Sequence, residues 1–194
     1  MDKQSLRKLN LEKRKSLSAE AVKALSESIT LQFSSLALDG ISFIHLFYPI
    51  PGKHEVDSLQ IAGWLRRTHP HLKLVLSRSD LQNHSLHHIL WEPGTELIQN
   101  KWGITEPVAG EEVKPEKLDM IIIPLLAYDV KGNRVGYGKG FYDRFLAECR
   151  KDALKVGLSF FGPEQEITGT DKHDIPLDLC LTPDTIWRFN DAMI

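Results

Sequence analysis

Four large apolar residues, Met120 to Ile123, stand in a row near the middle of the chain, between Asp119 and Pro124. An apolar run without polar alternation predicts a strand that is covered on both faces, as in the middle of a parallel sheet. Helices that pack on the two faces of such a sheet give it that cover. The run therefore indicates a layered α/β fold.

The other segments alternate between helix-like and strand-like patterns. The expected helices lie within residues 2–37, 56–67 and 141–151, the expected strands at 41–48, 72–76, 87–91, 120–123, 154–160 and 179–181, and a loop at 99–117. This alternation predicts one three-layer α/β/α domain over residues 1–194, with a mostly parallel central sheet on which the N-terminal helices of residues 2–37 pack. Because ligands of such sheets bind beyond the carboxyl ends of the strands, the loops after Tyr48 and Ile123 are the expected site.

The N-terminal region predicts two successive helices. Ser18 can cap the second, because its hydroxyl can accept a hydrogen bond from a free N–H group of the first turn. One apolar stripe with spacings of three and four residues then follows, made of Val22, Leu25, Ile29, Phe33 and Leu36.

The composition is ordinary for a globular protein, and its charge balance argues against a nucleic-acid partner. The formal net charge is −2, whereas a nucleic-acid binder normally carries a large basic surplus. No apolar run approaches the roughly 20 residues that cross a bilayer, and the N-terminus lacks the apolar segment of a signal peptide. Cys149 and Cys180 lack the spacing of a metal site or a disulfide framework, so we expect reduced thiols. We expect a cytoplasmic monomer with no nucleic-acid or membrane partner.

The segment from Gly136 to Gly140 has a glycine at every second position and leads into an expected helix at Phe141. Glycine lets backbone amides approach a bulky anion, and a helix N-terminus adds free N–H groups and a partial positive charge. Arg134 and Lys139 add full positive charges, and Asp143 follows where it could hold a divalent metal. The alternative is a flexible surface turn, since the spacing matches neither a P-loop nor a dinucleotide fingerprint.

A longer stretch around these glycines resembles a known family signature. The stretch comprises Pro124 to Asp129 and Gly132 to Arg144, and it resembles the signature of the 5-formyltetrahydrofolate cyclo-ligase (methenyltetrahydrofolate synthetase) family. The similarity extends over nearly the whole chain through Lys3 and Arg7, Glu55 to Asp57, Trp102 to Pro107, and the pair His173-Asp174. The resemblance implies an enzyme that uses ATP and Mg²⁺ to convert 5-formyltetrahydrofolate into 5,10-methenyltetrahydrofolate, ADP and phosphate. An ATP-dependent small-molecule kinase or ligase on the same fold that does not use folate is the alternative.

The resemblance also implies residue roles. It assigns ATP contacts to Lys3, Arg7, Arg134, Val135, Gly136, Tyr137, Gly138, Lys139, Gly140, Phe141 and Tyr142. It assigns folate contacts to Ile50, Glu55, Trp102, Tyr137, Gly138, Lys139, Gly140 and Phe141, catalytic roles to Lys139, Arg134 and Tyr142, and Mg²⁺ to Asp143 and Asp174.

Ordinary structural roles compete with several of these assignments. Lys3 and Arg7 are one turn apart and could grip one anion, but most such pairs form a solvated basic face. Glu55 could be an acid favoured by the dipole at a helix start, and Trp102 could be a core residue. Among the acids, Asp143 could cap a helix or pair with an arginine, and Asp178 could replace Asp174 as the metal ligand.

Overall fold

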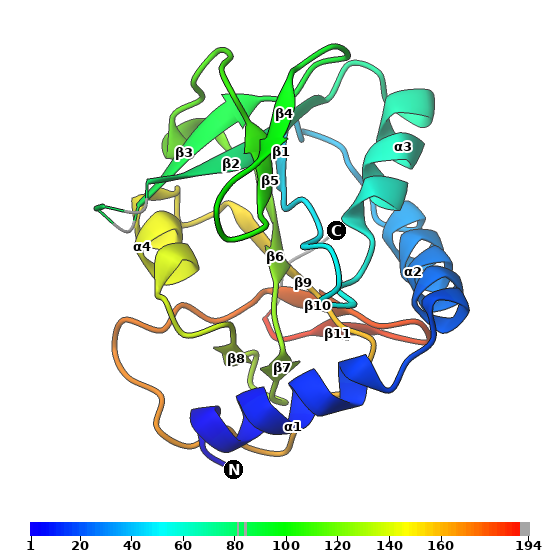
Figure 1. Cartoon of the computed structure of the whole chain (residues 1–194), viewed down its shortest axis with the longest axis vertical. Helices are drawn as coiled ribbons and strands as arrows, with labels where there is room; N and C mark the ends of the chain where they lie inside the picture. The colour runs from blue at the N-terminus through cyan, green and yellow to red at the C-terminus, as the bar shows by residue number, and fades with distance from the viewer. Residues whose placement is uncertain (81, 84, 191–194) are drawn as a thin grey trace.

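A seven-stranded sheet with the strand order β11-β10-β9-β6-β1-β2-β3 runs through the centre of the protein (Figure 1). Its strands are β1 (Phe43–Leu46), β2 (Lys73–Asp80), β3 (Ser85–Leu90), β6 (Met120–Pro124), β9 (Leu154–Leu158), β10 (Leu179–Leu181) and β11 (Ile186–Arg188). This computed structural model describes residues 1–80, 82–83 and 85–190, so the last four residues of the expected domain lie outside it.

Strand β6 lies in the middle of the sheet, as its apolar run predicts. It pairs in parallel with β1 on one side and with β9 on the other, and further parallel pairs join β1 to β2 and β9 to β10. Only the two outermost pairs, β2 with β3 and β10 with β11, are antiparallel among the described strands of this sheet. The prediction of a mostly parallel sheet is confirmed.

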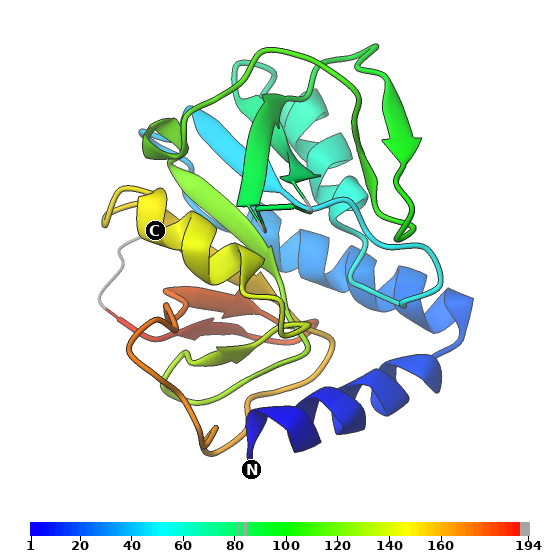
Figure 2. The ribbon, with the colours of Figure 1, turned by 60° about the vertical axis from the view of Figure 1, so that its left-hand side comes forward.

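Helices cover both faces of the sheet (Figures 1 and 2). On one face, α2 (Ala19–Ser34) and α3 (Ser58–Thr68) bury their apolar stripes against the cluster that contains Ile122. On the other face, α4 (Phe141–Glu148) packs over Ile121 and Ile123. Within the described part of the chain, none of the helices combines the length and the apolarity needed to span a bilayer.

Helix α1 (Lys3–Lys15) lies beside the small antiparallel pair β7 (Ala127–Tyr128) and β8 (Arg134–Val135), apart from the layers that cover the sheet (Figure 2). The Asp2 side chain caps this helix by accepting hydrogen bonds from the amides of the first turn. Leu6 is fully buried in a small cluster with the apolar residues of β7 and β8. The predicted second helix also has its predicted cap, because the Ser18 hydroxyl accepts from the Ala21 amide.

The prediction of a loop at residues 99–117 was wrong in part. The range includes the end of β4 (Leu97–Gln99), its hairpin partner β5 (Thr105–Pro107) and the short 3₁₀ helix η1 (Pro115–Lys117). The two strands pair only over three residues each, so no periodic apolar pattern announces them. The side chain of Asn100 holds the turn by accepting from the amides of Trp102 and Ile104. Strand β2 is also longer than predicted, and β7, β8 and β11 were not predicted.

Two buried histidines lie side by side under α4. His45 on β1 and His88 on β3 have ring centroids 5.4 Å apart, and the His88 ring stacks on Phe145 of α4 at 4.0 Å. Burial lowers the pKa of both imidazoles, and for His88 the pKa falls to about 4. Both histidines are therefore neutral in the folded protein at pH 7.

We expect the stability of the protein to fall as the pH is lowered from about 6.5 toward 4. Unfolded histidine takes up a proton near pH 6.5 whereas folded His88 takes it up only near pH 4, so acid favours the unfolded chain over this range. The contribution of His88 is about 3 kcal/mol at about 1.4 kcal/mol per pKa unit. Urea denaturation at pH 7.0, 6.0 and 5.0 should show a shallower decline in His88→Leu than in the wild type. The exposed residue His71, replaced by Leu, is the control, and equal pH slopes in all three proteins would contradict the prediction.

Candidate active site

A cavity of about 290 Å³ opens at the carboxyl edge of the sheet. Its walls come from the ends of β1, β2 and β6, the turn of the β4–β5 hairpin, the first half of α1 and the glycine-rich segment. Its volume is near the lower end of the range for ligand pockets, roughly 300 Å³ and above. The site therefore lies beyond the strand ends, where the sequence places it.

The cavity brings together every predicted site residue except Val135. The residues that line it are Lys3, Arg7, Ile50, Glu55, Trp102, Arg134, Gly136, Tyr137, Gly138, Lys139, Gly140, Phe141, Tyr142, Asp143 and Asp174. Val135 is buried in the cluster around Leu6, and its carbonyl accepts a hydrogen bond from the Leu126 amide. Because Val135 belongs to the β7–β8 pair and does not line the cavity, its contact with ATP stays a prediction.

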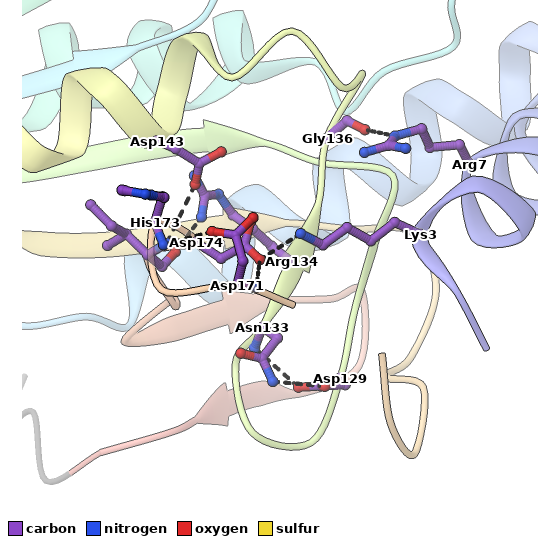
Figure 3. A network of polar contacts seen from close by, with 11 residues as sticks. Lys3, Arg7, Asp129, Asn133, Arg134, Gly136, Asp143, Asp171, His173 and Asp174 are labelled. Carbon is purple, nitrogen blue, oxygen red and sulfur yellow. Dashed lines mark hydrogen bonds and ion pairs between the residues drawn. The ribbon is translucent and has the colours of Figure 1, made fainter. Parts of the chain in front are cut away.

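The glycine-rich segment takes a shape that only glycine adopts easily. Gly138 and Gly140 have φ angles of +87° and +69°, and a Cβ on Gly138 would lie 3.2 Å from the Arg7 guanidinium. Arg7 also donates from Nε to the Gly136 carbonyl at 2.9 Å, which ties the segment to α1 (Figure 3). Gly140 is the N-cap of α4 and has no side chain that could cap it, and this end of the helix lines the cavity, where a helix N-terminus favours an anion.

Cations and carboxylates of the cavity pair with one another (Figure 3). The buried Arg134 guanidinium donates from Nη2 to Asp143 Oδ1 at 2.7 Å and from Nη1 to the Ile175 carbonyl. Lys3 Nζ donates to Asp174 Oδ2 at 2.5 Å. Partial burial of Asp174 opposes its ionisation, but its hydrogen bonds with Lys3 and with the Asp171 amide outweigh this and lower its pKa. Asp143 thus shows the arginine pairing that was its alternative role, while still lining the cavity.

Asp178, the alternative to Asp174, lies elsewhere. Its carboxylate forms an ion pair with Lys155 at 2.7 Å and accepts from the Lys155 amide at 2.8 Å, next to the start of β10. It does not line the cavity.

The lining of the cavity also includes a buried acid. Glu55 is 5% exposed, and its Oε1 and Oε2 accept from the Tyr137 hydroxyl at 2.8 Å and from the Ile50 amide at 2.7 Å. Burial raises the pKa of Glu55, while these hydrogen bonds and nearby cations work against that rise. Asp57, not Glu55, caps α3, so Glu55 is not a helix-start acid. Trp102 is 45% exposed at the β4–β5 turn, which excludes a core role for its side chain.

Two residues around the site were not predicted from the sequence. Ser77 lines the cavity and hydrogen-bonds through its hydroxyl to His45 Nε2 at 2.7 Å. It was not predicted because the expected strand ended at residue 76. Its place directly after that strand end was the available signal. Arg14 of α1 is 3% exposed and donates from Nη1 to the Tyr137 hydroxyl at 3.4 Å. Its spacing of seven residues from Arg7, two helical turns, was the available signal.

A layered α/β fold with a glycine-rich turn, a helix N-terminus and several cations around one cavity at the sheet edge is typical of proteins that bind phosphorylated ligands. The model of the 5-formyltetrahydrofolate cyclo-ligase family matches residues 1–183, and the chain belongs to this family.

Known proteins agree with this membership. The chain is 33% identical over 137 residues to the 5-formyltetrahydrofolate cyclo-ligase of Haemophilus influenzae, covering 69% of this chain and 72% of that protein. It is 30% identical over 181 residues to that of Mycoplasma genitalium, covering 93% and 98%. The NMR structure of Aquifex aeolicus 5,10-methenyltetrahydrofolate synthetase superposes with a TM-score of 0.82 at 33% identity, covering 99% of this chain and 95% of that one.

We expect Gly138→Ala to lower the free energy of unfolding of the ligand-free protein by about 1 kcal/mol or more, because a Cβ in left-handed backbone costs roughly 1–2 kcal/mol. Gly136 is the matched control, since its φ is not left-handed and a Cβ there would meet no atom within 4 Å. Gly136→Ala should therefore leave the unfolding free energy unchanged or raise it by up to about 1 kcal/mol. Urea denaturation of both variants measures this. Equal losses in the two would show that the segment does not hold the described conformation.

Proposed function

We propose that the protein catalyses the ATP-dependent cyclisation of 5-formyltetrahydrofolate to 5,10-methenyltetrahydrofolate, with release of ADP and phosphate. Membership of the cyclo-ligase family supports this reaction. The observation that carries the proposal is that one cavity holds both kinds of group the reaction needs. Lys3, Arg7 and Lys139 suit a triphosphate, while Glu55 and Trp102 suit a pterin and the ring attached to it.

The chemistry explains why a nucleotide is needed. A formamide carbon is a poor electrophile, and its oxygen is a poor leaving group as hydroxide. The formyl oxygen attacks the γ-phosphorus of ATP and ADP leaves, which gives an imidate phosphate. N10 then attacks the formyl carbon and loses its proton, and the carbon–oxygen bond breaks as phosphate departs with the former formyl oxygen.

Phosphoryl transfer of this kind depends mainly on positioning and on stabilising charge. Lys139, Arg134, Lys3 and Arg7 offset the phosphate charge, together with the amides of the glycine-rich segment. Burial and the nearby Glu55 charge raise the pKa of Tyr142, so its phenol stays protonated and can donate a hydrogen bond. Lys139, Arg134 and Tyr142 are thus the proposed catalytic residues.

The acids of the cavity fit a Mg²⁺ ion that arrives with the nucleotide. Asp143 and Asp174 both line the cavity and lie near Arg134, which pairs with Asp143 and acts electrostatically on Asp174 (Figure 3). Mg²⁺ is commonly held by one or two carboxylates together with phosphate oxygens and water, so two acids are sufficient. Within the described residues, no group of three or more His, Cys, Asp or Glu side chains could hold a metal ion. The ion would supply neutralisation of phosphate charge.

Glu55 and Trp102 favour folate over a substrate of an unrelated ATP-dependent kinase. The edge of a pterin offers adjacent N–H donors that a carboxylate can accept together. Trp102 offers an open aromatic face at the mouth of the cavity. We further propose that residues 1–194 act as one domain, as a cytoplasmic monomer that binds these small molecules and no nucleic acid.

The decisive assay follows the absorbance of methenyltetrahydrofolate when the protein is mixed with 5-formyltetrahydrofolate. Product should form with ATP and Mg²⁺ and should not form without ATP. Lys139→Ala should lower kcat/KM for ATP by about 100-fold or more, the usual effect of removing one charge-stabilising group. Lys131→Ala removes an exposed lysine that pairs with Glu166 and should keep wild-type kinetics. Wild-type turnover in Lys139→Ala would argue against its catalytic role, and absence of product with ATP would refute the proposed reaction.

A further inference from the structure

Arg14 occupies an unusual place for an arginine in the last turn of a helix. Its neighbours in α1, Lys13 and Lys15, are exposed, whereas Arg14 is 3% exposed and points into the protein. Nη2 donates to the Leu125 carbonyl, which follows β6, and Nη1 donates to the Tyr137 hydroxyl at 3.4 Å. No described carboxylate lies within ion-pair distance of this guanidinium. Burying a guanidinium charge costs free energy unless hydrogen bonds and attraction to another charged group compensate for the lost water.

The group on which Arg14 acts is Glu55. The Tyr137 hydroxyl bridges the two residues, because it accepts from Arg14 and donates to Glu55 Oε1 at 2.8 Å. The chain around Glu55 is tied to the same residue, since the Arg14 carbonyl lies 2.9 Å from Nδ1 of His54. Helix α1 thus holds Glu55 through both the side chain and the backbone of Arg14.

We propose that Arg14 is a positioning residue for the reaction: through the Tyr137 hydroxyl it keeps the Glu55 carboxylate charged and oriented toward the pterin. This inference rests on the proposed function, because it assumes that folate is the ligand of Glu55. Under this proposal the two ends of α1 have different roles. Lys3 and Arg7 line the phosphate side of the cavity, and Arg14 supports the folate side from behind the cavity wall.

The charges around Glu55 explain why such support is needed. Burial disfavours the carboxylate and raises the pKa of Glu55, and the opposing contributions come from the Ile50 amide, the Tyr137 hydroxyl, Arg14 and Lys53. The other titratable group that interacts with it, Tyr142, is neutral at pH 7. Lys53 is exposed, so its attraction is screened by water. Removal of Arg14 should therefore raise the pKa of Glu55 further, and a protonated acid no longer accepts two pterin N–H groups.

The experiment measures the Kd of 5-formyltetrahydrofolate from pH 5 to 8 by quenching of tryptophan fluorescence, without ATP. In the wild type, affinity should fall as the pH drops through the pKa of Glu55, and Glu55→Gln should remove this dependence. Arg14→Met should move the fall to higher pH by about one unit, which makes binding about two- to fivefold weaker at a pH between the two midpoints and close to tenfold weaker below both. Arg14→Lys, which keeps the charge, should return the midpoint toward the wild-type value.

Matched measurements separate positioning from a role in folding alone. Lys8→Met, an exposed change on the same helix, should keep the wild-type profile. The Kd of a non-hydrolysable ATP analogue should change less than about twofold in Arg14→Met. Tyr137→Phe removes the bridging hydroxyl at a partly exposed position, so it provides a second test should Arg14→Met fail to fold, and it should also move the midpoint upward.

The outcomes are distinct. An unmoved midpoint in Arg14→Met and Tyr137→Phe, or equal losses of folate and ATP affinity at every pH, would overturn the role of Arg14 and leave the proposed function intact. A wild type that binds no 5-formyltetrahydrofolate at any pH would overturn both. A shifted midpoint with unchanged affinity for the ATP analogue would establish the proposal.

Discussion

Strand β6 determines the layered architecture of the protein, because both of its faces are shielded from water. Ile121, Ile122 and Ile123 are all fully buried and point alternately into the two core clusters. An apolar strand of this kind can be covered only by two layers of helices, and its parallel neighbours require crossovers that lead the chain back to the same edge. The segments that leave the carboxyl ends of β1, β2 and β6 consequently meet at one place, and the cavity lies there.

At that place the protein neutralises its own charges. Arg134 is paired with Asp143, and Lys3 is paired with Asp174. Both pairs are partly or largely withdrawn from water, so each ion would be costly without its partner. The proposed nucleotide, bound together with a divalent cation, would offer replacement partners of both signs, so the pairs could separate without leaving a charge uncompensated.

The sequence predicted those features that depend on neighbouring residues in the chain. The Ser18 cap, the apolar stripe of α2 and the buried strand β6 follow from spacing and side-chain type, and the structure contains all three. Features that depend on pairing across the chain were predicted poorly. The β4–β5 hairpin was expected to be a loop, since strands of three residues carry too few side chains to reveal a pattern. The position of the cavity could be predicted, because sheet topology fixes it, but the roles of its residues remain predictions that came from family resemblance.

Arg14 shows why the support behind a site is harder to predict than the site itself. Residues that touch a ligand belong to a motif, and the motif can be matched. A supporting residue is defined by what surrounds it. From the sequence alone, α1 has the pattern of a solvated basic helix, because the surface on which it packs is not visible there.

In the structure the buried stripe of α1 is Leu6, Asn10 and Arg14, so two of three buried positions are polar. A helix that only had to cover apolar surface would place apolar residues at those positions, because burying a polar group costs free energy unless it finds a partner. Asn10 finds its partner within α1, in the Leu6 carbonyl, whereas Arg14 finds its partners in the segments that form the site. The packing of α1 and the arrangement of the cavity wall that contains Glu55 are therefore stabilised by the same hydrogen bonds.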